Sequence, residues 1–145
     1  MSHSLPFRQI GDFQITALSD GMMSASLDLL SGIEKTDADA IQNDAGLDEP
    51  GDIHINCYLI RGQGRVILVD TGAGPLSNKG GHLNINLAAA GVSPDEVDTV
   101  LLTHCHPDHI GGLLDTEKQP VFQHADIMLH PLEAVSYTHL RAHET

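Results

Sequence analysis

Residues 103–112 read Thr-His-Cys-His-Pro-Asp-His-Ile-Gly-Gly and place three His and one Asp within six positions. The apolar run 99–103, which predicts a buried strand, ends where this cluster begins. Alternate residues of an extended chain point to the same side, and a turn after Pro107 can bring the last His beside the others. Imidazole nitrogens and carboxylate oxygens are donors that suit zinc and similar divalent metals. The predicted metal ligands are His104, His106, Asp108 and His109.

Four adjacent ligands on one short loop would strain a single closed site. We therefore predict that two divalent metal ions share them, as in hydrolases whose ions lie about 4 Å apart. Zinc is expected, with iron, manganese or cobalt as alternatives. Cys105 stands between two predicted ligands and is expected to face away from them, in a buried and inert position.

Asp70 stands directly after the apolar run 66–69, which predicts another buried strand. Ligand sites in open α/β sheets gather at the carboxyl ends of strands, so we expect Asp70 to lie near the His cluster. Its predicted role is to accept the second ring N–H of a ligand His and so fix the tautomer of that ring. A turn-capping role is the alternative. Gly72 and Gly74 would allow a close backbone approach, although turn formation explains them almost as well.

The other patterns predict alternating strands and helices, and hence the α/β (α+β) class. Gly62-Gln63-Gly64 is expected to close a hairpin, and Ser93-Pro94-Asp95-Glu96 has the form of a capping box that opens a short helix. The acidic stretch 34–52 is interpreted as a solvated loop. The predicted strands cover 13–19, 53–61, 66–69, 99–103 and 127–130, and the main predicted helix covers 82–90.

The composition fits a soluble globular protein, with a formal net charge of −13 and only seven Lys and Arg. This charge argues against nucleic acid or an anionic membrane as a partner, because phosphate binding needs basic residues. Two cysteines are too few for a disulfide framework, and neither a signal peptide nor a membrane span is evident. We expect a cytoplasmic protein with a small-molecule substrate, and its oligomeric state stays open.

The two motifs together resemble those of the metallo-β-lactamase superfamily. T-H-C-H-P-D-H-I-G-G is similar to the H-x-H-x-D-H motif of that superfamily, and V-D-T-G at Asp70 looks like its preceding motif. The resemblance spans about residues 7–133. Residues 17–21, 69–74 and 89–91 are most similar to the branch of methyl parathion hydrolase and quorum-quenching lactonases.

The resemblance implies the N-terminal half of a four-layer αββα sandwich with a dinuclear metal site at one edge. His104 and His106 would bind the first metal, and Asp108 and His109 the second. The family adds a third His, a bridging Asp and a final His further downstream, and no residue here matches them. His124 and His130 are not expected to replace them. The implied activity is attack by a metal-bound hydroxide on an ester, lactone or phosphotriester, with Asp108 as the catalytic residue that orients the hydroxide or receives its proton.

The last residues, 135–145, resemble a sequencing-library adapter translated in frame. We therefore expect residues 1–134 to be a truncated metallo-β-lactamase-fold domain and residues 135–145 to be an artefact derived from the adapter. A genuine amphipathic tail is the alternative.

Other activities share this half of the site. The alternatives are a glyoxalase II-like thioesterase, a nuclease of the ribonuclease Z type, which the acidity disfavours, and an iron-binding oxidoreductase. From a different class comes a catalytically inactive fragment that binds metal weakly, which is what we expect of the 145-residue chain by itself.

Overall fold

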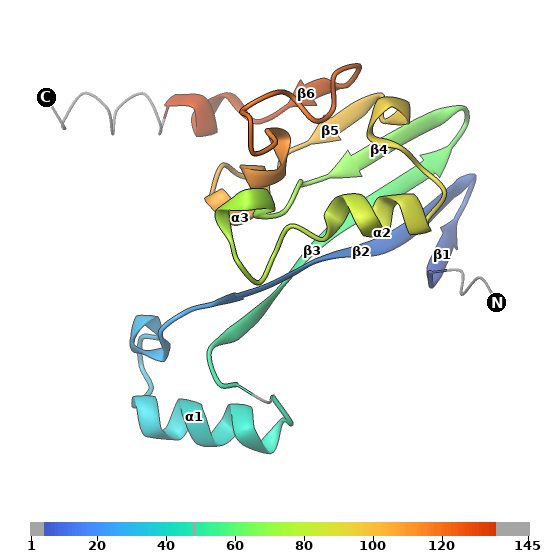
Figure 1. Cartoon of the computed structure of the whole chain (residues 1–145). Helices are drawn as coiled ribbons and strands as arrows, with labels where there is room; N and C mark the ends of the chain where they lie inside the picture. The colour runs from blue at the N-terminus through green and yellow to red at the C-terminus, as the bar shows by residue number, and fades with distance from the viewer. Residues whose placement is uncertain (1–4, 48, 136–145) are drawn as a thin grey trace, which may run out of the picture.

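The structure is a computed structural model that describes residues 5–47 and 49–135. Within these residues, six strands form one mixed sheet (Figure 1) and lie in it in chain order. The first four strands pair antiparallel, whereas β4–β5 and β5–β6 pair parallel. The predicted mixed α/β class is confirmed. The strands are β1 (Phe7–Ile10), β2 (Phe13–Ser24), β3 (Asp52–Gly62), β4 (Arg65–Val69), β5 (Thr99–Leu101) and β6 (Asp126–Met128).

The pairing of β3, β4 and β5 sets up the functional edge of the sheet. The predicted hairpin is confirmed: Gln63 and Gly64 connect β3 to β4, and both have positive φ angles, of 50° and 74°. This is the backbone of a type I′ turn, which matches the twist of the paired strands. In the parallel pair β4–β5, Val69 lies opposite Leu101. The loops that follow these two strands therefore start side by side at one edge.

Helix α2 (Leu83–Ala89) lies in the crossover between β4 and β5 and covers one face of the sheet (Figure 1). The predicted helix 82–90 is thus confirmed. The predicted capping box is present: the Ser93 N–H donates to the Glu96 carboxylate at 2.8 Å, and one 3-10 turn follows. The remaining helical segments are α1 (Lys35–Asp44), α3 (Pro107–Ile110), and the 3-10 turns η1 (Leu27–Leu29), η2 (Gly74–Leu76), η3 (Pro94–Glu96) and η4 (Gly111–Leu113).

The core lies between α2 and the sheet face that it covers. Leu18, Leu59 and Leu68 point to this face from three neighbouring strands, and Leu87 meets them from the helix; each is fully buried. Truncating one of these leucines to Ala would cost about 2–5 kcal/mol. Tyr58, which alternates with Leu59 along β3, lies on the opposite face and is 45% exposed.

The prediction of a solvated loop over 34–52 is wrong, because this stretch contains the ten-residue helix α1. Its acidic residues Asp37 and Asp44 are exposed, and the half-buried Asp39 pairs with Lys35 one turn earlier at 2.9 Å. Ala38 is the buried residue of this helix. A helix with so narrow an apolar face lacks the periodicity that would have predicted it.

Strand β2 continues to Ser24, whereas the prediction ended it at Asp20 and Gly21. The register shifts between Ser19 and Gly21, which is the mark of a β-bulge, and pairing with β3 resumes beyond it. Gly21 therefore lies at a bulge inside the strand and does not form a turn that ends it. Strand β1 was not predicted, and its four residues are exposed.

Residues 136–145 lie outside the described residues, so the boundary at residue 134 and the adapter origin of residues 135–145 stay predictions. None of the helices within residues 5–47 and 49–135 has the length and apolar character needed to cross a bilayer.

Candidate metal centre

The predicted ligands lie where the chain changes from extended to helical backbone after β5. His106 has extended backbone angles, φ −70° and ψ 151°, and is the N-cap residue of α3. Pro107 occupies the first position of that helix, where its fixed φ and missing N–H are tolerated. Asp108 and His109 therefore stand on the first turn of α3, beside the extended residues that precede it.

His104 and His106 face each other through ring nitrogens. Nε2 of His104 lies 3.1 Å from Nδ1 of His106, and the two ring centroids are 4.6 Å apart in an edge-on arrangement. Two imidazole nitrogens that point at one place are suited to share a single cation.

Asp108 and His109 form a second facing pair. Nε2 of His109 lies 3.3 Å from Oδ2 of Asp108. The rings of His104 and His109 have centroids 3.9 Å apart, so the two pairs adjoin. The structure thus brings together all four residues that the sequence predicted, grouped in the two pairs that the family resemblance implied.

Each pair supplies two donors. Among residues 5–47 and 49–135, no three His, Cys, Asp or Glu side chains are arranged to hold one ion together. A zinc site in a protein has three or four protein ligands, and each facing pair offers two. Neither pair by itself is therefore a complete zinc site. The donor chemistry suits divalent metal ions, and an ion at either pair would need further ligands.

Asp70 lies directly beneath the cluster. Its side chain is buried, and Oδ2 lies 2.8 Å from Nδ1 of His109. Thr103 donates to the same carboxylate twice, from its N–H to Oδ1 at 2.8 Å and from its hydroxyl to Oδ2 at 2.7 Å. An ionised carboxylate only accepts hydrogen bonds, so the network assigns the proton of His109 to Nδ1 and leaves Nε2 free for a metal. The contact supports the predicted tautomer-fixing role, which stays a prediction.

The backbone of Asp70 has φ 59°, in the left-handed region that is uncommon outside glycine but tolerated by Asp. Its N–H donates to the Leu101 carbonyl at 2.9 Å, which continues the β4–β5 pairing by one residue. This left-handed residue turns the chain at the sheet edge and directs the side chain toward the loop after β5. Such backbone positions cluster at functional sites.

The loop after Asp70 packs backbone to backbone against α3 and η4. The Thr71 N–H donates to the His109 carbonyl at 2.8 Å, and a Cβ added to Gly111 would lie 2.1 Å from the Ala73 carbonyl oxygen. Gly72 has φ 70°, and a Cβ there would lie 2.2 Å from Cγ of Asp20. The two explanations considered for Gly72, turn formation and close approach, therefore both apply.

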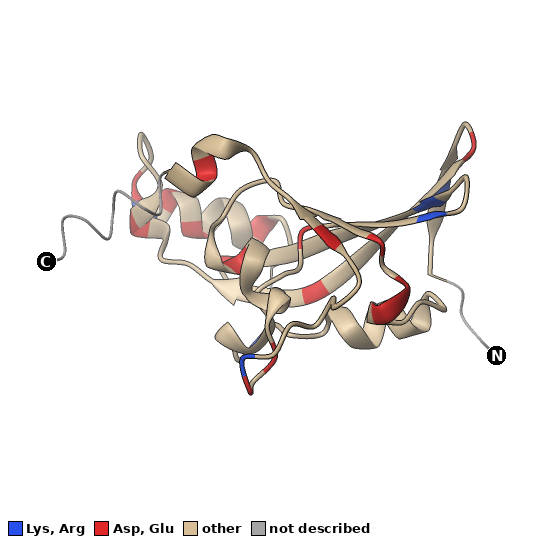
Figure 2. Ribbon diagram, turned by 90° about the horizontal axis from the view of Figure 1, so that it is seen from above, with Lys and Arg blue, Asp and Glu red and all other residues tan. Residues whose placement is uncertain are grey.

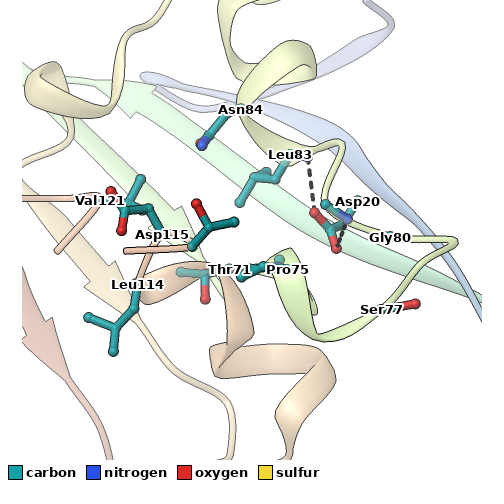
Figure 3. Close-up of a pocket in the computed structure, with 14 residues that line it drawn as sticks. Asp20, Thr71, Pro75, Ser77, Gly80, Leu83, Asn84, Leu114, Asp115 and Val121 are labelled. Carbon is teal, nitrogen blue, oxygen red and sulfur yellow. Dashed lines mark hydrogen bonds between the residues drawn. The ribbon is translucent and has the colours of Figure 1, made fainter. Parts of the chain in front are cut away.

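Asp20 is a functional-site residue that the sequence analysis missed. It is fully buried, and its carboxylate accepts hydrogen bonds from the N–H groups of Ala73, Gly81 and Leu83 at 2.9–3.0 Å. Figure 3 shows this carboxylate directed at the chain that leads into α2. Asp20 thereby holds the loop that follows Asp70. An acid on the inward-facing side of an alternating strand was the signal that could have identified it.

Cys105 is buried, and desolvation raises the pKa of its thiol, which disfavours a thiolate ligand there. Its backbone N–H donates to Oε2 of Glu133 at 3.0 Å. His54, His124 and His130, which were not predicted as ligands, are all exposed.

A mixed sheet with metal-type donors in the loop after its parallel strand β5 defines the chain as an α/β protein with a candidate metal site at the sheet edge. The chain belongs to the metallo-beta-lactamase superfamily, because the model of the family described as "Metallo-beta-lactamase superfamily" matches residues 50–138.

Two solved structures share the fold over nearly the whole chain. The hydrolase AbOPH of the beta lactamase superfamily is 34% identical with a TM-score of 0.80, and the match covers 90% of this chain and 46% of that one. AidC, a dizinc quorum-quenching lactonase in complex with a product, is 27% identical with a TM-score of 0.81, covering 92% and 47%. This chain therefore spans about half the length of each.

Among curated proteins, ribonuclease Z of Mycobacterium avium (strain 104) is 44% identical over 57 residues, which cover 39% of this chain and 18% of that protein. The uncharacterized protein YobT of Bacillus subtilis (strain 168) is 39% identical over 75 residues, covering 52% and 29%.

Proposed function

We propose that the protein is a metal-dependent hydrolase of esters, lactones or phosphotriesters. The observation that carries this proposal is the arrangement of two facing donor pairs above the Asp70 carboxylate. His104 and His106 would hold one divalent ion, and Asp108 and His109 the other. We expect zinc, with iron, manganese or cobalt as alternatives that accept the same donors.

Divalent ions bound at this place would lower the pKa of a water molecule and polarise the carbonyl or phosphoryl oxygen of the substrate. In the hydrolysis, oxygen from water bonds to the carbonyl carbon or phosphorus, the ester bond breaks, and the leaving oxygen takes a proton.

The residues of the chain position and transfer protons in this reaction. Asp108 is the proposed catalytic residue: its side chain is 27% exposed, so water can reach the carboxylate and donate a hydrogen bond to it. Asp70 and Thr103 hold the imidazoles in the tautomers that leave Nε2 free.

The similarity to AidC, a dizinc quorum-quenching lactonase, supports a lactonase over the alternatives, and the similarity to the hydrolase AbOPH supports a hydrolase in general. A glyoxalase II-like thioesterase stays the second candidate, because it would use the same four ligands. The similarity to ribonuclease Z raises a nuclease as a third, but the charge counts against it. Acidic residues clearly outnumber basic ones along the ribbon in Figure 2. Three of the few basic side chains, Lys35, Arg65 and Lys79, are paired with carboxylates. We therefore propose a small-molecule substrate, with neither nucleic acid nor membrane as a partner.

The further metal ligands are proposed to come from sequence downstream of residue 134, because this chain covers about half of the similar structures. The 145-residue chain alone is then expected to be inactive and to bind metal weakly. Resequencing the source DNA across codons 133–135 tests this. We expect the frame to diverge at residue 135 and to supply two further His and an Asp; a genomic stop codon after residue 145 would contradict it.

The activity is tested on the gene product from that resequenced frame. We would measure zinc content and the hydrolysis of a phosphotriester, an acyl-homoserine lactone and an aryl ester. The double variant H104A/H106A should lose one metal equivalent and nearly all activity. His124→Ala, an exposed histidine outside the cluster, is the matched control and should behave like the wild type. Hydrolysis that survives in the double variant would overturn the proposal.

A further inference from the structure

A pocket of about 470 Å³ opens beside the Asp108 carboxylate. Its apolar walls come from three elements: Met23 near the end of β2, Leu76 in η2 and Pro107 at the start of α3. A second pocket, of about 380 Å³ (Figure 3), is lined by Leu114, Asp115 and other residues but by none of the four predicted metal ligands. Of these two pockets, the one beside Asp108 adjoins the candidate chemistry.

The wall formed by Leu76 has a fixed backbone and an exposed side chain. The Leu76 N–H donates to the Ala73 carbonyl at 3.0 Å, and the Ala73 N–H donates to Oδ2 of the buried Asp20 at 2.9 Å. The Leu76 side chain is nevertheless 68% exposed. A ligand that covers this exposed side chain would remove its apolar surface from water, and the backbone that carries it is already ordered.

Lys79 also lines the pocket, and its charge is already matched. Its Nζ lies 3.0 Å from Asp52, 3.2 Å from Glu49 and 2.9 Å from the Ser24 hydroxyl. The ammonium group therefore has two carboxylate partners and offers little to an anionic ligand tail. The neutralised Lys79 and the carboxylate of Asp108 therefore favour an uncharged group in this pocket.

We propose that this pocket binds the uncharged apolar group attached to the scissile bond, and that Met23 and Leu76 determine specificity for it. The inference rests on the proposed function, because it takes Asp108 to be part of the reacting centre. The apolar group could belong to the acyl side of the substrate or to its alkoxy side.

Binding can be measured on the 145-residue chain without metal, by NMR of ¹³C-labelled methionine methyl groups. The sequence has four methionines, and Met23→Leu assigns the resonance of interest. The probes are N-acyl-homoserine lactones with acyl chains of four to eight carbons, together with alkyl acetates of matched length. We expect the Met23 methyl resonance to shift, that of Met128 on β6 to stay, and affinity to rise by up to about fourfold per added methylene.

Two alanine variants and a charged probe test whether the ligand occupies this pocket. Leu76→Ala should weaken binding severalfold, whereas Ile85→Ala, an equally exposed side chain on α2, should not. A probe whose acyl chain ends in a carboxylate should bind at least tenfold more weakly than the uncharged probe. Dependence on acyl length or on alkoxy length identifies which side of the substrate occupies the pocket.

Failure of this inference is distinguishable from failure of the proposed function. An unmoved Met23 resonance up to the solubility limit, equal binding of the carboxylate probe, or equal effects of the two alanine variants would overturn the pocket assignment. Length-dependent binding combined with an absence of metal-dependent hydrolysis in the complete gene product would instead overturn the function and leave the pocket intact.

Discussion

The hydroxyl of Thr103 lies 2.7 Å from Oδ2 of Asp70 and 3.1 Å from Nδ1 of His104. A hydroxyl has one hydrogen to donate, and the carboxylate can only accept. The Thr103 hydroxyl therefore donates a hydrogen bond to Asp70 and accepts one from Nδ1–H of His104. In this tautomer Nε2 of His104 carries no hydrogen. Because His109 also contacts Asp70, we expect one buried carboxylate to fix the tautomers of two predicted ligands, His109 directly and His104 through Thr103.

Replacement of Thr103 tests this chain of hydrogen bonds from Asp70 to His104. Thr103→Val keeps the shape of the side chain but removes both hydrogen bonds, so we expect the zinc affinity to fall about 10–100-fold. Thr103→Ser keeps the hydroxyl and should bind zinc nearly as tightly as the wild type. Competition with a chromophoric chelator measures the affinity, and ¹⁵N chemical shifts of His104 report its tautomer. Equal zinc affinity in the Val and Ser variants would contradict this role of the hydrogen bonds.

Asp70→Asn should weaken zinc binding by a similar factor, about 10–100-fold, because a neutral amide oxygen is a poorer acceptor for His109. Asn tolerates left-handed backbone, so the conformation at this position should persist. Loss of the buried charged acceptor should also lower the free energy of unfolding by about 1–3 kcal/mol. Chelator competition and urea titration measure the two effects, and Asp28→Asn on the surface is the control. A variant that loses stability but keeps full zinc affinity would show that Asp70 acts only in folding.

Asp20→Ala should destabilise the chain by at least ~3 kcal/mol, because three backbone N–H groups would lose their acceptor inside the protein. Asp20→Asn retains one acceptor oxygen and should cost less. Urea unfolding followed by circular dichroism measures both variants. Asp28→Ala, at an exposed position, should change the unfolding free energy by less than about 0.5 kcal/mol. A loss for Asp20→Ala no larger than for this control would contradict the assigned role.

The lowered pKa of Asp98 should make the free energy of unfolding depend on pH. The Arg65 guanidinium, followed by the Val66 N–H, lowers the pKa of Asp98 from 3.8 to about 2. Because the folded pKa lies below the unfolded one, this carboxylate stabilises the fold above about pH 4 and loses that effect as the pH falls toward 2. The side chain is 37% exposed, so the contribution should stay below about 1 kcal/mol.

The measurement is the difference in unfolding free energy between the wild type and Asp98→Asn across this pH range. The difference should be constant near neutrality and shrink between pH 4 and pH 2. Asp95→Asn, at an exposed neighbouring position, is the control. A difference that does not change with pH would exclude the Arg65 pairing as its source.

The ligand loop could be predicted from sequence because its information is local. Six consecutive residues contain all four donors: extended backbone pairs His104 with His106, and the first turn of α3 places Asp108 and His109 beside them. The hairpin around Gln63 and the helix 82–90 were predictable for the same reason, since turn chemistry and apolar spacing act over a few residues.

The supporting residues were harder to predict because their partners are distant in the sequence. Asp20 contacts backbone groups more than fifty residues away, and nothing near it in the chain marks those partners. The hydroxyl of Thr103 is adjacent to the ligands, yet its role depends on Asp70, 33 residues earlier. The prediction over residues 34–52 missed helix α1 for a different reason, since an exposed acidic helix has the same composition as a solvated loop.

The confinement of four ligands to residues 104–109 has a consequence for how metal would affect folding. These side chains stay within a few residues of one another in the unfolded chain, which can therefore also chelate an ion. A ligand stabilises a fold only by the difference between its affinities for the native and unfolded states. Zinc should thus raise the unfolding midpoint by less than its native-state affinity implies. The part of that affinity that reaches stability is supplied by groups that meet the loop only in the folded chain, as Asp70 meets His109.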